Sequence, residues 1–138
     1  MNGTKNLALE LCEKISMAND KFRKVQAKQM FEQKLTSPQF GVLDILYKSG
    51  PRSLKKISDE MMVTGANITC VVDNLEKEGF VIRIHSKEDR RVILADLTES
   101  GRNKLESVLL DYHKNISALV SSLTEREQEE FIILLDKF

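Results

Sequence analysis

Three cations lie close together in a segment of this 138-residue chain where the backbone is expected to reverse direction. Lys87, Arg90 and Arg91 flank Asp89 in the sequence Lys-Glu-Asp-Arg-Arg, between two short apolar runs. Two such runs joined by a short charged segment predict a β-hairpin, or wing, with the cations at its tip. Ammonium and guanidinium groups gathered on a protruding loop are suited to binding an anionic partner such as nucleic acid.

The segment just before this hairpin predicts a helix with two distinct faces. Ile68, Val71, Val72 and Leu75 recur at helical spacing and predict a buried stripe. The other face carries mainly small or polar side chains, which suit a helix that enters a major groove about 12 Å wide. These outer residues are Thr64, Ala66, Asn67, Thr69, Cys70, Asp73 and Asn74. A solvated surface is the alternative, but the turn before the helix and the wing after it favour DNA recognition.

A helix-turn-helix is predicted around this segment. A short helix marked by Leu54, Ile57 and Met61 is followed by a tight turn at residues 63–65 and by the helix at 66–78. The run Thr-Ser-Pro-Gln at 36–39 predicts the start of an earlier helix, because a hydroxyl cap precedes proline in the first turn. Ser-Gly-Pro at 49–51 predicts its end.

Long apolar helices flank this part of the chain. Helical spacing predicts a first helix over residues 5–33 and a fifth that begins after Thr98. A last helix, beginning at Thr124, ends in an apolar C-terminus. These helices have more apolar surface than a domain of this size can bury, so we expect a second copy of the chain to cover it.

Composition narrows the class of protein. The formal net charge is zero, with an acidic C-terminal segment that offsets a mildly basic middle, so binding to an anion would depend on a local patch. The sequence contains no run that predicts a membrane span or a signal peptide, and we expect a cytoplasmic protein. Cys12 and Cys70 form no metal-ligand spacing with His85 or His113. No catalytic grouping is recognisable, so we expect neither an enzyme nor a cofactor.

Three segments together resemble the MarR (multiple-antibiotic-resistance regulator) family of winged helix-turn-helix repressors. They are Leu-Thr-Ser-Pro-Gln-Phe at 35–40, Ile-Thr at 68–69 leading through Leu-Glu-Lys-Glu-Gly-Phe-Val at 75–81 to Arg83, and Asp-Arg-Arg-Val at 89–92 leading to Leu-Thr-Glu-Ser-Gly at 97–101. The resemblance implies a mainly α fold with a small β-hairpin wing (α+β). It assigns residues 36–98 to a DNA-binding lobe, and 1–35 with 99–138 to a helical dimerisation region, within one continuous domain.

The resemblance also implies a function. A homodimer would bind a pseudo-palindromic operator in double-stranded DNA, with the helix at 66–78 in the major groove and a wing arginine in the minor groove. Arg90 is our first choice for that arginine and Arg91 the second, with Asp89 fixing the wing. Thr64, Asn67 and Thr69 are expected to contact bases or phosphates, and Ala66 and Cys70 share their face. Lys87 and Arg83 are expected to contact the backbone, with Lys55 and Lys56 as weaker candidates.

One departure from the family pattern affects the expected affinity. Cys70 and Asn74 stand where relatives often carry arginine. Two fewer cations would weaken the phosphate-driven part of binding. We therefore expect a moderate binder that depends on its wing.

The trigger that would release DNA is less sharply indicated. Many members of the family respond to a small aromatic or phenolic ligand. The matching region here would involve Met17, Phe22, Met30, Phe40 and Tyr47. Each of these residues, taken singly, fits ordinary packing better. A redox response through Cys12 is an alternative, as is a winged-helix module that binds only other proteins. For Cys12 no supporting constellation of tyrosines is evident. A protein-binding module would not need Arg90 and Arg91 at the wing tip.

Overall fold

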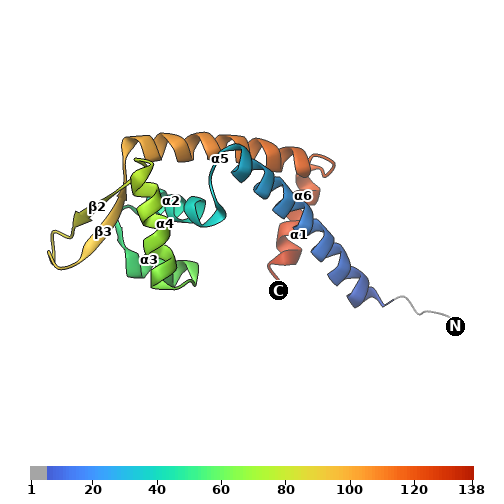
Figure 1. Cartoon of the computed structure of the whole chain (residues 1–138). Coiled ribbons are helices and arrows are strands. Elements are labelled where there is room, and N and C mark those ends of the chain that lie inside the picture. Colours follow the sequence, from blue (N-terminus) through green and yellow to red (C-terminus); the bar gives the residue numbers. More distant parts are fainter. Residues whose placement is uncertain (1–5) are drawn as a thin grey trace. The chain divides into compact units, whose positions relative to one another are not determined.

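The computed structural model describes residues 6–138, and in that range it contains six helices and three short strands (Figure 1). The helices are α1 (Leu7–Glu32), α2 (Ser37–Ser49), α3 (Leu54–Met61), α4 (Gly65–Lys77), α5 (Glu99–Leu119) and α6 (Glu125–Leu135). The strands are β1 (Arg52–Ser53), β2 (Val81–His85) and β3 (Ile93–Leu97). The chain divides into two compact units, Met30–Leu110 and the segments up to Gln29 and from Asp111 to Phe138. The predicted fold class, mainly helical with a small β wing, is confirmed.

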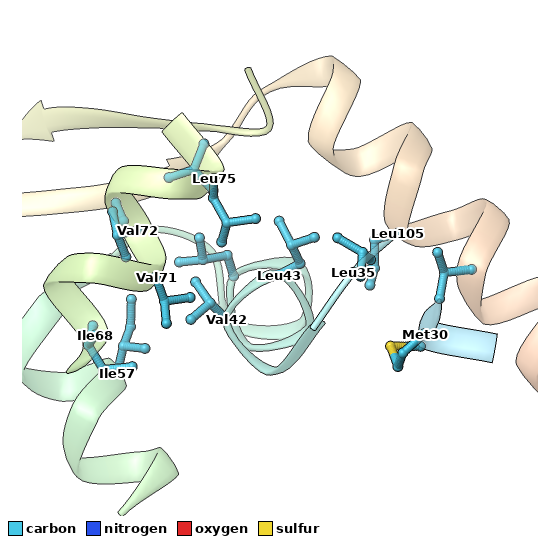
Figure 2. Close-up of a cluster of buried hydrophobic side chains, with 14 residues drawn as sticks. Met30, Leu35, Val42, Leu43, Ile57, Ile68, Val71, Val72, Leu75 and Leu105 are labelled. Carbon is cyan, nitrogen blue, oxygen red and sulfur yellow. The ribbon is translucent and has the colours of Figure 1, made fainter. Parts of the chain in front are cut away.

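The unit Met30–Leu110 is built around one apolar core. Leu43 from α2, Ile57 from α3, Leu75 from α4 and Leu105 from α5 are all fully buried, and Figure 2 shows them converging. Each large side chain withdrawn from water in this way stabilises the fold by roughly 1.5–3 kcal/mol. The predicted stripe of α4 is confirmed, since Ile68, Val71, Val72 and Leu75 are all buried.

Helix boundaries in this unit follow from local chemistry. The Oγ1 of Thr36 accepts a hydrogen bond from the backbone N–H of Gln39, and the Gln39 side chain accepts one from the Thr36 N–H. This reciprocal capping box satisfies two donors that the first turn of α2 leaves unpaired. At the other end Gly50 has a positive φ of 75°, which ends the helix just before Pro51.

The sheet has one strand more than the sequence predicted. β2 and β3 form the expected antiparallel hairpin, with Val81 opposite Leu97 and His85 opposite Ile93. β1 pairs with the other edge of β3, so that the strand order is β1-β3-β2. Because β1 lies directly before α3, this pairing attaches the helix-turn-helix to the base of the wing.

The second unit is helical and presents many exposed apolar side chains. No residue of α6 is buried, although the helix contains Phe131, Ile132, Ile133, Leu134 and Leu135. The first two turns of α1 are also exposed at Leu7, Leu9 and Leu11. None of the described helices is both long enough and apolar enough to cross a membrane.

Candidate nucleic-acid interface

The outer face of α4 is capped and accessible. Thr64 is the N-cap residue, and its Oγ1 accepts a 3.2 Å hydrogen bond from the backbone N–H of Asn67. Within the helix the hydroxyl of Thr69 donates to the carbonyl oxygen of Gly65 at 2.9 Å. All of the predicted recognition residues on this face are exposed: Thr64, Ala66, Asn67, Thr69 and Cys70. The capping role of Thr64 was not predicted, although a threonine directly before a helix is the usual signal for it.

Two of the wing residues hold each other at the tip of the hairpin. The Oδ1 of Asp89 accepts hydrogen bonds from the backbone N–H and the Nε of Arg91, each at 3.1 Å, and its Oδ2 accepts one from Nη2 at 3.2 Å. These donors, the Arg91 side chain first and its backbone second, hold the pKa of the Asp89 carboxyl below its ordinary value. The predicted role of Asp89 in fixing the wing is therefore consistent with a loop that is closed on itself.

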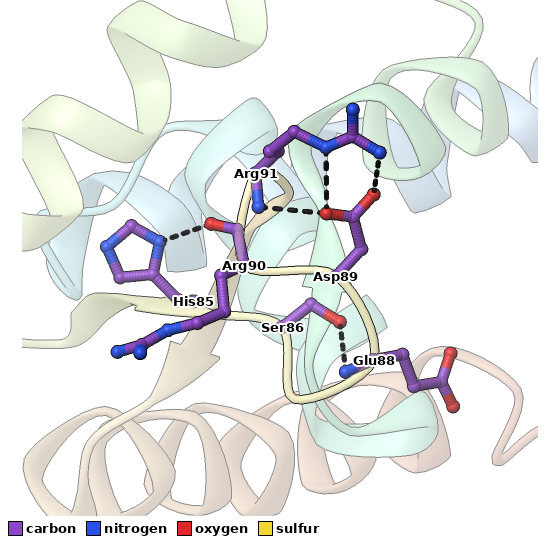
Figure 3. A network of polar contacts seen from close by, with 6 residues as sticks. All are labelled: His85, Ser86, Glu88, Asp89, Arg90 and Arg91. Atoms are coloured by element: carbon purple, nitrogen blue, oxygen red, sulfur yellow. Dashed lines mark hydrogen bonds and ion pairs between the residues drawn. The ribbon is translucent and has the colours of Figure 1, made fainter.

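Arg90 differs from its neighbour. Its carbonyl oxygen lies 2.8 Å from Nδ1 of His85, which anchors the loop backbone to β2. Its guanidinium points away from the Asp89–Arg91 pair (Figure 3). Within residues 6–138 neither this group nor the ammonium of Lys87 forms an ion pair, and both side chains are exposed. The wing thus presents two cations whose charge is not compensated by the described part of the chain.

Arg83 lies at the centre of β2 and turns toward α4. Its Nη1 lies 2.9 Å from Oε1 of Glu76, and its Nη2 lies 2.5 Å from Oδ1 of Asp73. The side chain is only 24% exposed, half as much as that of Asp73. The structure therefore pairs Arg83, which was predicted to contact the DNA backbone, with two carboxylates of α4.

A hollow of about 540 Å³ lies between the wing loop and the start of α3. Its lining includes the apolar side chains Ile84, Val92 and Leu94, the cations Arg52, Lys56 and Lys87, and the acids Glu88 and Asp89. Ser53, which also lines the hollow, caps α3 by accepting a hydrogen bond from the Lys56 backbone N–H at 3.2 Å. The hollow brings together Lys56 and Lys87, which the sequence could only suggest separately, and adds Arg52. Lys55 is exposed on the same helix.

The residues predicted for ligand binding fall into two groups. Met30 belongs to the buried core of its unit, and Phe40 and Tyr47 pack against that core. Tyr47 also donates its hydroxyl to Glu106 at 3.2 Å and lies under the guanidinium of Arg102, 5.3 Å from the ring centre. Met17 and Phe22 are exposed on α1. Packing thus accounts for the first group.

Cys12 and Cys70 are free and exposed thiols. No hydrogen bond links Tyr47 or Tyr112 to Cys12 among residues 6–138; the Tyr112 ring lies against that of His113. The same residues contain no group of three side chains able to hold a metal ion.

Known proteins have sequences similar to that of this helix-turn-helix and wing. The sequence model of the MarR family matches residues 35–93, which include α2, the helix-turn-helix, β2 and the wing loop up to the first residue of β3. The transcriptional repressor MdtR of Bacillus subtilis is 35% identical over 109 residues, a stretch that covers 77% of this chain and 70% of MdtR. The chain belongs to the MarR family.

Further MarR-type similarity extends beyond the matched segment. The HTH-type regulator YkoM of B. subtilis is 34% identical over 72% of this chain, but the match spans only 64% of YkoM, so that relative is the longer protein. The crystal structure of YusO from B. subtilis superposes with a TM-score of 0.81 at 28% identity, over 99% of this chain and 96% of YusO. As a MarR-family protein the chain is a transcriptional regulator of the helix-turn-helix type and not an enzyme.

Proposed function

We propose that the protein binds a double-stranded DNA operator through α4 and the wing. The carrying observation is that one small unit presents two exposed elements side by side in sequence. One is a helix face of short side chains, and the other is a hairpin tip with the uncompensated cations Lys87 and Arg90. In this proposal α4 enters the major groove, where Asn67 and the two threonines contact base edges or phosphates.

Arg90 is proposed to be the side chain that enters the minor groove. Among residues 6–138 its guanidinium has no carboxylate partner, whereas Arg91 would have to leave Asp89 before it reached DNA. A narrow minor groove attracts a free guanidinium through its negative potential. Arg91 is then a positioning residue that keeps the loop closed.

The hollow beneath the wing is proposed to accommodate the DNA backbone between the two grooves. Arg52, Lys56 and Lys87 line it from three different segments, and of the two acids in the lining, Asp89 is already paired with Arg91. Phosphate contacts of this kind fix the register of the protein on the duplex without reading its sequence. They would compensate in part for the missing arginines at positions 70 and 74.

We further propose that the protein acts as a homodimer whose interface includes α1 and α6. Five successive apolar residues of α6, Phe131–Leu135, are between 43% and 61% exposed in the single chain, which is costly unless another surface covers them. A two-fold dimer would require a pseudo-palindromic operator with half-sites about one helical turn apart. Repression is the proposed outcome, because MdtR is named a repressor.

Release of DNA by a small aromatic or phenolic ligand completes the proposal. Met17 and Phe22 supply exposed apolar side chains on α1 for such a ligand. The cysteine-based response has weaker support, because among residues 6–138 neither Tyr47 nor Tyr112 bonds to Cys12, and the hydroxyl of Tyr47 donates to Glu106.

Selection of bound duplexes from a random library tests the proposal, because it lets the protein itself define its operator. We expect enrichment of a pseudo-palindrome with half-sites about 10 base pairs apart. A library that stays random after repeated rounds, although the protein is folded and dimeric, would contradict DNA recognition and favour a protein-binding module.

A further inference from the structure

Arg83 joins two elements of the proposed interface. It lies on β2 opposite Ala95 of β3, and its guanidinium bridges Asp73 and Glu76, which are one turn apart on α4. Arg83 is seven residues from Glu76 and ten from Asp73 in sequence, so these ion pairs fasten the first strand of the wing to α4. The arginine is the most enclosed member of the three, with 24% of its side chain exposed against 49% and 43% for the acids.

The two carboxylates are unexpected on this part of the molecule. Asp73 follows Cys70 by one helical turn on the exposed side of α4, and Glu76 follows Asp73 by another. In the proposed complex this ridge passes close to DNA phosphates, and an uncompensated carboxylate there would be repelled. An arginine suits the masking of two acids at once, because its planar fork offers several donors in fixed directions.

We propose that Arg83 is a positioning residue for DNA binding that acts by masking Asp73 and Glu76 and not by contacting phosphate. This inference rests on the proposed function. It differs from the expectation drawn from the sequence, in which Arg83 contacts the backbone as Lys87 does. The difference in surroundings supports it, since Lys87 and Arg90 have no carboxylate partner among residues 6–138 and Arg83 has two.

The test compares removal of the arginine with removal of the arginine and its acids together. Arg83→Gln keeps two of the three side-chain methylenes and removes the charge, leaving the two carboxylates without this cation. The triple variant Arg83→Gln, Asp73→Asn, Glu76→Gln removes all three charges. Fluorescence anisotropy on the selected operator duplex measures the affinity of each variant, and circular dichroism melting checks that each is folded.

We expect Arg83→Gln to lose at least tenfold in operator affinity and the triple variant to recover to within about threefold of the wild type. Removing the charges of Asp73 and Glu76 does not restore the bridge between β2 and α4. A recovery of operator affinity would therefore show that Arg83 acts by neutralising these carboxylates. The matched control is Lys48→Gln, which removes a cation paired with Asp44 on α2 at 3.0 Å, away from the wing. That variant should bind like the wild type.

The outcomes separate this inference from the proposal beneath it. The inference would be overturned if the wild type binds the operator but the triple variant binds it as weakly as Arg83→Gln does. Arg83 would then contact DNA directly or serve only to brace β2 against α4. Wild-type affinity in Arg83→Gln would overturn it as well. A wild-type protein that does not discriminate the selected duplex from a scrambled one would overturn the proposed function and the inference together.

Discussion

Asp89 and Arg91 are joined by three hydrogen bonds of 3.1–3.2 Å at the tip of the wing, one from the backbone and two from the guanidinium. Both residues remain in contact with solvent, and the Arg91 side chain is 91% exposed. The pairing therefore serves mainly to shape the loop, since exposed ion pairs contribute little to global stability. It also distinguishes the two adjacent arginines: Arg91 is paired with Asp89, and Arg90 has no carboxylate partner among residues 6–138.

The pKa of Asp89 should reveal this pairing. Hydrogen bonds from Arg91 favour the charged carboxylate and lower its pKa below 3.8 in the folded protein. Because the folded pKa is lowered, the pairing stabilises the wing fully at any pH above the ordinary pKa of an aspartate. This contribution is lost as the pH falls through the folded pKa. We therefore expect no change in wing order between about pH 5 and pH 8 from this group.

Carboxyl carbon shifts measured by NMR across an acid titration would check this expectation. In Arg91→Ala the Asp89 carboxyl should titrate at a higher pH than in the wild type. Identical titration curves in the two proteins would show that the pairing does not form in solution.

Replacing the two wing arginines singly should have unequal effects on DNA binding. Arg90→Ala is expected to cost about 1–3 kcal/mol of operator binding, because a direct groove contact is lost. Arg91→Ala should cost less, since its guanidinium is engaged by Asp89. Anisotropy titrations at fixed salt give both values. Arg126→Ala, which alters an exposed arginine paired with Glu130 on α6, is the control. A larger loss in Arg91→Ala than in Arg90→Ala would reverse the assignment.

Gly101 should be indispensable for the junction between wing and α5. A Cβ built at this position would lie 2.0 Å from the backbone oxygen of Phe80, which cannot yield as a flexible side chain would. Gly101→Ala should therefore destabilise the protein by about 3 kcal/mol or more. Gly65→Ala is the matched control, since no atom lies within 4 Å of its Cβ and its φ is not positive. Thermal melts that are alike for the two variants would contradict the clash.

A charge placed on the exposed apolar face of α6 should prevent dimerisation. Ile133 is 61% exposed in the single chain, so Ile133→Glu costs little within the subunit but would put a carboxylate into the proposed interface. Sedimentation velocity is expected to show a dimer for the wild type and a monomer for the variant. Glu129→Gln on the same helix should remain dimeric. A wild-type protein that sediments as a monomer at micromolar concentration would contradict the proposed interface.

Much of the fold could be predicted because its signals are local. The cap at Thr36, the break at Gly50 and the period of the α4 stripe depend on residues within a few positions of one another. Strand β1 could not be predicted, because two residues cannot display an alternating pattern and its existence depends on pairing with β3, some forty residues away.

In the candidate site, too, local features could be predicted from the sequence and long-range contacts could not. Residue types alone marked Lys87, Arg90 and Arg91 as cations but could not say which were already paired. The family resemblance groups Arg83 with Lys87 as a cation that contacts the DNA backbone. Its carboxylate partners follow from how β2 packs on α4, which only the folded chain specifies.

The central claim, that the wing and α4 together recognise duplex DNA, is tested most directly by reversing the charge of the wing tip. The double variant Arg90→Glu, Arg91→Glu should remain a folded dimer and lose operator binding, while the wild type binds the selected duplex tightly and in a salt-sensitive manner. Anisotropy on operator and scrambled duplexes over a salt series gives the result. Undiminished operator binding by the double variant, or equal binding of both duplexes by the wild type, would contradict the claim.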